Sequence, residues 1–323
     1  MIRHAYNRLA SVVASVIWTE DRTRARAPWR IVVPLIPALA IAVGVMFLVG
    51  DALSIPALIF VSQLTLAVTV FVLFAASTRY LDRGRSIWEY GLRFDRRWGS
   101  DLVAGFLIGI VAVAVPYVVG IAMGWFEISA VLSPGPVGLW VGVVVIILAY
   151  LCTGFWEELF FRGVLMVNAA EGLRRRLSPR SAIAGVLILQ AVIFGVIHVE
   201  QWTAQAPHPA FVTTWILSGF VFGLLYLLAN DLALPIGVHA AGNAAGASLF
   251  SEHPPADGGM SVIVLVEPLS QSMLLGHGGL MMISSNLIVG VLGVLWLWVS
   301  RDSGLDLWTH PAFFVGERDP REP

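Results

Sequence analysis

Eight apolar stretches along the chain each have about the length that crosses the hydrocarbon core of a bilayer. They cover residues 31–49, 52–77, 102–123, 137–155, 182–197, 209–229, 232–250 and 279–299. Lipid offers the backbone no water to bond, so each stretch is expected to be a helix. With 58% apolar and 13% charged residues, the composition excludes a soluble enzyme and a disordered chain. The sequence therefore predicts an all-α, polytopic integral membrane helical bundle of about eight transmembrane helices.

The basic residues are all arginine, and they flank these stretches on one side only. They precede the first stretch, lie in the second and fourth connections and follow the last stretch: Arg3, Arg8, Arg22, Arg24, Arg26, Arg30, Arg79, Arg83, Arg85, Arg93, Arg96, Arg97, Arg174, Arg175, Arg176, Arg180, Arg301, Arg318 and Arg321. The short sixth connection, 230–231, contains none and is uninformative. The intervening connections at 50–51, 124–136, 199–208 and 251–277 contain none. Under the positive-inside rule, both termini are expected to be cytoplasmic.

The chain divides into a short N-terminal segment, one membrane domain and a tail. Residues 1–30 form the cytoplasmic segment, with an amphipathic interfacial helix over 1–18; residues 31–299 form the membrane domain, and 300–323 a cytoplasmic tail. The run 261–266, within the longest outer connection, is expected in the interface or in a loose loop.

Cys152 is the one cysteine, which excludes a disulfide framework and a cysteine metal cluster. Arginine without lysine is typical of a GC-rich genome and favours a bacterial cell membrane.

Three charged residues, Glu157, Glu158 and Arg162, lie inside the apolar stretches. Such a residue costs about 2.5–3.5 kcal/mol on insertion scales and usually faces a cavity or a partner. Glu158 and Arg162 are spaced as a helical ion pair. Glu157 points about 100° away around the helix and lacks a partner nearby in sequence, which makes it a candidate general base. Alternatively, Glu157 ends a helix at the interface, because the run 137–170 is about 51 Å long as one helix.

Two histidines and an asparagine add to this group. His198 ends the fifth stretch, and His239 and Asn243 lie four residues apart on one face of the seventh. A single histidine in an apolar helix is usually a packing residue. Taken with Glu157, however, these side chains supply a base, donors for an oxyanion and a possible zinc site made of His198, His239 and Glu157.

These residues resemble the motifs of the CPBP family, the CAAX-processing and bacteriocin-processing intramembrane endopeptidases. The motifs are Glu-Glu-x-x-x-Arg, Phe-x-x-x-His and His-x-x-x-Asn, in this order within residues 155–243. The resemblance implies that Glu157 activates water, that His198 positions it, and that His239 and Asn243 stabilise the oxyanion. It implies that Glu158 and Arg162 hold the site together. The substrate would be a membrane-associated protein or peptide, with no role for nucleic acid.

Two chemistries remain open for this site. Glu157 acts directly on water in one, which the resemblance favours, and zinc activates the water in the other. The resemblance also implies a site open to the cytosol. With straight helices, however, His239 would lie nearer the cytoplasm than His198. We therefore expect the fourth or fifth helix to be broken, tilted or longer than the apolar stretches 137–155 and 182–197.

Two other classes of function compete with a protease. A proton-coupled transporter would use Glu157 and the histidines as a proton relay. A catalytically silent, immunity-type membrane scaffold would keep its function without Glu157. The sequence shows no inverted repeat, which disfavours a transporter.

Overall fold

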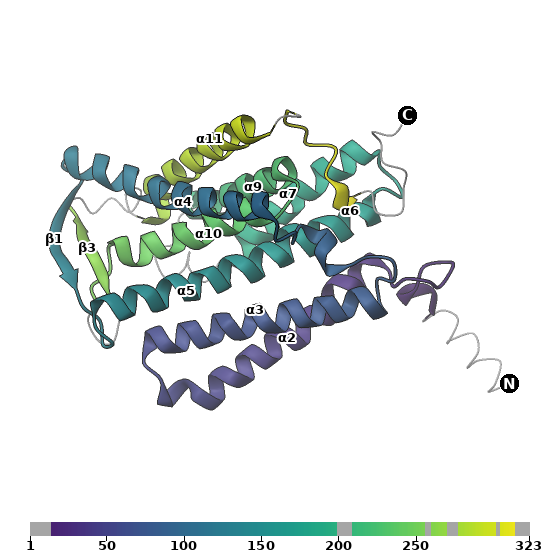
Figure 1. Cartoon of the computed structure of the whole chain (residues 1–323), viewed down its shortest axis with the longest axis horizontal. Coiled ribbons are helices and arrows are strands. Elements are labelled where there is room, and N and C mark those ends of the chain that lie inside the picture. The colour runs from purple at the N-terminus through teal and green to yellow at the C-terminus, as the bar shows by residue number, and fades with distance from the viewer. Residues whose placement is uncertain (1–13, 199–208, 256–259, 270–276, 302–303, 314–323) are drawn as a thin grey trace.

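The computed structural model describes residues 14–198, 209–255, 260–269, 277–301 and 304–313. It is a bundle of helices with a small β-sheet at one end (Figure 1). The main helices are α2 (Ala27–Val49), α3 (Ile55–Tyr80), α4 (Arg96–Ala122), α5 (Leu139–Glu158), α6 (Val167–Leu173), α7 (Pro179–Ile197), α9 (Pro209–Ala229), α10 (Ala233–Ala244) and α11 (Met282–Ser300). Short helical turns are η1 (Gly50–Ala52), η2 (Ile87–Tyr90) and η7 (Pro311–Phe313), and π-helical turns are η3 (Leu159–Met166), η4 (Ala245–Leu249) and η6 (His277–Met281). The predicted interfacial helix of residues 1–18 lies outside the described residues up to position 13.

Seven helices among the described residues are long and apolar enough to cross a membrane. Their outward faces carry large apolar side chains, such as Phe47 and Leu48 on α2 and Trp298 on α11, which are more than half exposed. Such a surface fits lipid rather than water. The predicted all-α membrane bundle is confirmed.

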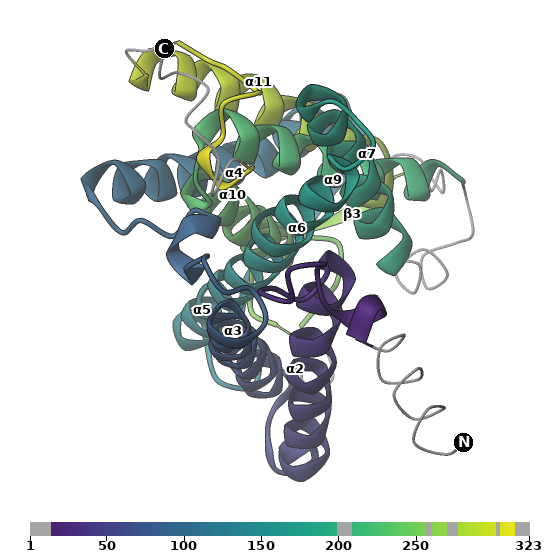
Figure 2. The same cartoon turned by 90° about the vertical axis from the view of Figure 1, so that its right-hand side faces the viewer.

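The predicted stretch 232–250 is the one that does not form a full-length span. It forms α10, of 12 residues, and η4, of 5 residues, which together are shorter than the roughly 20 residues a crossing needs. Almost every residue of α10 is buried, between α4, α5 and α9 (Figure 2). A helix enclosed by other helices need not match the thickness of the bilayer. The expected eighth crossing is therefore a short inner helix.

The fourth stretch forms one continuous helix that is longer than a membrane is thick. α5, η3 and α6 run without a break from Leu139 to Leu173, 35 residues or about 52 Å. The π-helical stretch η3 lies in its middle, directly after Glu158. π-Helical turns are frequent at functional sites because they shift the side-chain register of a helix.

A three-stranded sheet, which the sequence analysis did not anticipate, closes one end of the bundle. β3 (Val262–Pro268) is the central strand, antiparallel to β1 (Phe126–Ser133) and parallel to β2 (Phe250–Ser251). The run 261–266 therefore lies mostly in a paired strand and not in a loose loop. Tyr117 of α4 packs against Phe126 and Phe250, which joins the sheet to the helices.

Close packing of glycine brings α10 against its neighbours. A Cβ at Gly154 of α5 would lie 2.9 Å from the Ile236 oxygen of α10. A Cβ at Gly237 of α10 would lie 2.3 Å from the Leu102 oxygen of α4. Any larger residue at these positions would push the helices apart, so Gly154 sets how near α10 comes to α5 and Gly237 how near it comes to α4.

Candidate active site

Glu158 and Arg162 form a buried ion pair next to Glu157. Both are fully buried, and Arg162 donates to Glu158 Oε1 over 2.9 Å. Arg162 also contacts the carbonyl oxygen of Gly219 in α9 at 3.4 Å, and its guanidinium lies 4.6 Å from the centre of the Phe194 ring. The predicted pairing of Glu158 with Arg162 is present, and it links α5 and η3 to α7 and α9.

His239 contacts both glutamates. Its Nδ1 lies 2.7 Å from Glu158 Oε1, and its Nε2 lies 3.7 Å from Glu157 Oε2. Because a carboxylate accepts, Nδ1 is the donor, and the ring is held with Nε2 toward Glu157. The sequence placed these residues 81 and 82 positions apart, and the packing of α10 on α5 brings them together.

His198 lines the same cavity as Glu157 and His239 but is held by other partners. It caps α7, and its Nδ1 lies 2.6 Å from the carbonyl oxygen of Phe194. Its ring stacks on Trp215 of α9, with centroids 4.2 Å apart. A carbonyl can only accept, so Nδ1 carries the proton and Nε2 is left as an acceptor.

A cavity of about 630 Å³ connects these side chains. Glu157, His198, His239 and Asn243 line it, together with Ile59, Gln63, Tyr117, Tyr150, Thr153, Trp215, Gly246, Ala247, Ser251, Glu252, His253, Pro254 and Met260. Glu157 is nine-tenths buried at its inner end, and its Oε2 makes no hydrogen bond to the described residues. Asn243 is partly buried, one helical turn after His239. Four of the six predicted residues thus line one cavity, and Glu158 and Arg162 lie behind it as an ion pair.

The depth mismatch expected from straight helices does not arise. The long helix containing Glu157 extends well past the site on the arginine-rich side. The turn before α10 packs under η2, where the Leu232 amide donates to the Gly91 carbonyl. His239 therefore lies level with Glu157 along the bundle, although it is only six residues from the start of α10.

The possible zinc ligands do not form a metal-binding set. In the part of the chain that the structure describes, no three His, Cys, Asp or Glu side chains are grouped closely enough to hold a metal ion. His239 Nδ1 bonds Glu158 and His198 Nδ1 bonds a backbone carbonyl, so on each ring Nε2 is the nitrogen left for a further partner.

Several residues of the site were not anticipated as part of it. Thr153 and Tyr150 line the cavity four and seven residues before Glu157, so helical spacing could have indicated them. Trp215 and Glu252 carried no such signal, because they come from distant segments. Gln63 of α3 also accepts a hydrogen bond from Trp156 at 2.8 Å and lines the cavity.

Residues 138–245 match the family model described as type II CAAX prenyl endopeptidase Rce1-like. The chain carries a CAAX-protease domain. The matched range contains the predicted motif core, 155–243, and all six candidate residues. No curated protein and no solved structure matches the chain.

The CAAX-protease domain accounts for the elements that build the site. It covers α5 through α10, the helices that contribute the six residues, and leaves out α2, α3, α4 and α11. The family supports an endopeptidase of the CAAX-protease type in a multi-pass membrane protein.

Proposed function

We propose that this protein is a glutamate-type intramembrane endopeptidase that hydrolyses a peptide bond in a membrane-associated protein or peptide. The observation that carries the proposal is the Glu157 carboxylate. It lies buried at the inner end of a cavity of about 630 Å³, with Oε2 unbonded and His239 at 3.7 Å. A buried carboxylate without a full ion-pair partner lowers the stability of the folded protein. Such a carboxylate is typical of a catalytic general base.

Glu157 takes a proton from a water molecule in the cavity, and the water oxygen attacks the scissile carbonyl carbon. His198 Nε2, an acceptor, orients that water from the other side. The proton then passes from Glu157 to the departing amide nitrogen as the C–N bond breaks. One water is consumed, and a new carboxyl and a new amine are formed.

Asn243 and His239 stabilise the negative charge that develops on the carbonyl oxygen. The Asn243 amide and the Nε2 side of the His239 ring both face the cavity, where they would contact that oxygen. Glu158 holds the His239 ring through Nδ1, and Arg162 holds Glu158. Glu158 and Arg162 are therefore positioning residues.

The experiment compares membrane proteomes from cells expressing the wild type and Glu157→Gln. Mass spectrometry of peptide termini should reveal cleavages in membrane-associated proteins that the wild type makes and Glu157→Gln does not. Glu127→Gln, the same change on an exposed strand residue, is the matched control and should cleave like the wild type. Cleavage by Glu157→Gln at the wild-type level would contradict the proposal and favour a silent scaffold.

A metal assay tests the mechanism separately. Purified, active protein should contain far less than one zinc per chain and keep its activity with a chelator. Stoichiometric zinc together with loss of activity on chelation would overturn the glutamate-type mechanism but not the protease itself.

A further inference from the structure

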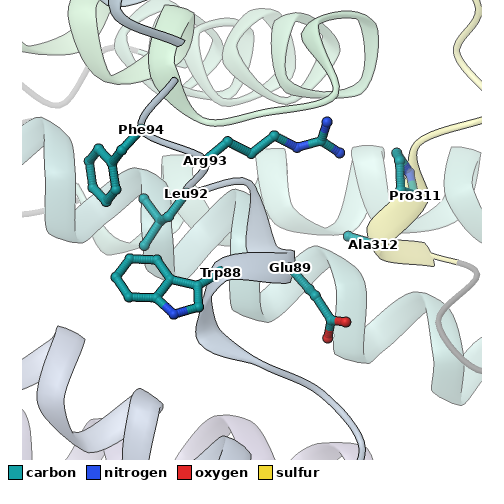
Figure 3. A pocket seen from close by; sticks show the side chains of 7 residues that line it. All are labelled: Trp88, Glu89, Leu92, Arg93, Phe94, Pro311 and Ala312. Atoms are coloured by element: carbon teal, nitrogen blue, oxygen red, sulfur yellow. The ribbon is translucent and has the colours of Figure 1, made fainter. Parts of the chain in front are cut away.

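A groove of about 550 Å³ lies at the arginine-rich end of the molecule and contains none of the six candidate site residues. Five of its lining residues belong to the connection between α3 and α4, and the other two, Pro311 and Ala312, belong to η7 (Figure 3). The arginine-rich end is the one that carries this connection and the connection between α6 and α7, with Arg83, Arg85, Arg93, Arg174, Arg175 and Arg176.

One side of the groove consists of exposed aromatic rings. Trp88 is 50% exposed and Phe94 57%, and their ring centroids lie 5.9 Å apart. Phe94 has a left-handed backbone, with φ 48°, which is uncommon for a bulky residue. Packing on Trp98 of α4, with ring centroids 4.6 Å apart, holds the Phe94 ring in this position. The fold therefore keeps two large apolar rings exposed side by side, which is typical of a binding surface.

These rings lie beside the membrane spans. Trp88 packs on Phe71 of α3, with ring centroids 5.9 Å apart. Phe71 comes nine positions before Tyr80, the last residue of α3, which is about 13 Å along the helix. Both α3 and α4 are long and apolar enough to cross a membrane. The aromatic side of the groove therefore lies where lipid surrounds the bundle, and aromatic side chains are enriched at such interfaces.

The other side of the groove carries one positive and one negative side chain. In Figure 3 the charged ends of Arg93 and Glu89 lie toward η7, and the two rings lie on the opposite side. Arg93 is exposed and has no carboxylate at ion-pair distance among the described residues. Glu89 Oε2 accepts the Ser86 amide over 2.7 Å, which leaves Oε1 for a further partner. The groove is therefore amphipathic, with both signs of charge at its polar side.

We propose that this groove binds one membrane phospholipid with a phosphoethanolamine headgroup. A guanidinium pairs with a phosphodiester through charge-assisted hydrogen bonds, and a carboxylate accepts hydrogen bonds from a primary ammonium. The lipid phosphate pairs with Arg93, its ammonium pairs with Glu89, and an acyl chain lies along Trp88 and Phe94. Phosphatidylglycerol has no cation to pair with Glu89, and the quaternary ammonium of phosphatidylcholine has no N–H to donate. The charges of the groove thus match phosphatidylethanolamine better than either of these lipids.

Native mass spectrometry of the purified chain tests the site, with dioleoyl-phosphatidylethanolamine, -phosphatidylglycerol or -phosphatidylcholine added in detergent. The wild type should bind one phosphatidylethanolamine more tightly than either of the other lipids. Arg93→Gln should weaken this binding about tenfold, which is the effect of losing one charge-assisted hydrogen bond. Arg83→Gln, a change of an exposed arginine in the same connection but outside the groove, is the matched control and should bind like the wild type.

Glu89→Gln separates the two halves of the headgroup. Glutamine can still accept from the Ser86 amide, so the local turn is kept. The affinities for phosphatidylethanolamine and phosphatidylcholine should then differ by no more than about twofold, because the group that distinguishes them is gone. Tighter binding of phosphatidylglycerol than of phosphatidylethanolamine by the wild type would overturn the proposal. Equal binding of phosphatidylethanolamine by the wild type and Arg93→Gln would also overturn it, and would favour the chain's own residues 314–323 as the occupant. The measurement needs no proteolysis, so the lipid site and the protease can fail separately.

Discussion

Two groups of charged side chains, one partly buried at the arginine-rich end and one buried at the catalytic cavity, differ in how far their charges are paired. The first, at the arginine-rich end, joins Arg24, Arg30 and Arg85 to Asp82 and Glu171. Arg30 bridges the two acids, lying 2.7 Å from Asp82 and 2.8 Å from Glu171. Each acid in this group contacts all three arginines, so its charge is fully compensated.

The second group, at the catalytic level, contains two glutamates but only one arginine. Arg162 pairs with Glu158, and within the described part of the chain the ion-pair partner of Glu157 is His239, at 3.7 Å. In the first group, every negative charge is paired, and the ion pairs hold α2, α3 and α6 together. In the second group, one carboxylate lacks an arginine partner and is available for chemistry. The comparison predicts that the first group governs stability and the second governs activity.

The largest effect is expected from Glu157→Gln. Loss of the general base should lower turnover by about 10²–10⁴-fold. The melting temperature in detergent should stay the same or rise, because an incompletely paired buried charge is removed. Glu158→Gln is the informative neighbour: it should lower both turnover and stability, since Glu158 holds Arg162 and His239. A marked drop in melting temperature for Glu157→Gln would contradict the prediction that the catalytic group governs activity rather than stability.

Asp82→Asn should be the corresponding change at the arginine-rich end. Removing one partner of a buried ion pair costs about 3–5 kcal/mol, and here it leaves Glu171 as the acidic partner of Arg30 and Arg85. Unfolding in detergent measures the loss, and turnover of the folded fraction should be nearly unchanged. Asp51→Asn, an exposed carboxylate, should change stability by no more than about 0.5 kcal/mol.

Asn243→Ala tests whether the catalytic group includes an oxyanion donor. Loss of one such donor lowers turnover by about 10²–10³-fold. Gln63→Ala is the matched control, since this amide lines the same cavity but is bonded to Trp156. Equal losses of turnover in the two variants would argue against a specific role for Asn243.

The smallest effect is a pH dependence that separates two carboxylates outside the spans. Burial opposes ionisation of Asp82, but Arg30, Arg24 and Arg85 outweigh it and lower its pKa. Burial raises the pKa of Asp231 to about 7, although the Ala233 amide bonds its carboxylate. Asp82 therefore contributes stability that is lost as pH falls through its folded pKa. Asp231 does the opposite: between about pH 4 and 7 the folded state holds the extra proton, so stability falls as pH rises.

Melting temperatures of the purified protein across pH 4–8 measure this dependence. Asp231→Asn should remove a slope of about 1 kcal/mol per pH unit within that interval. An unchanged profile in Asp231→Asn would show that this carboxylate does not titrate there.

Much of the fold and the site could be predicted because membranes impose simple rules. Apolar length located the helices, and intramembrane charge pointed to Glu157, Glu158 and Arg162. Motif order added His198, His239 and Asn243. The small sheet was missed because its strands lie far apart in the sequence, in the connections between apolar stretches. The stretch 232–250 was taken for a crossing because hydropathy does not distinguish lipid from a protein interior.

By itself, the sequence determined that the chain is a membrane bundle, how its arginines divide between the two ends, and which ionisable residues lie within it. These properties follow from the local cost of placing polar groups in hydrocarbon, which depends on residue type and length. Only the tertiary structure decided that His239 meets both glutamates, that His198 does not, and that the cavity reaches the sheet end. Those facts depend on close packing at Gly154 and Gly237 and on pairing between distant strands, which are contacts between segments that no local rule encodes.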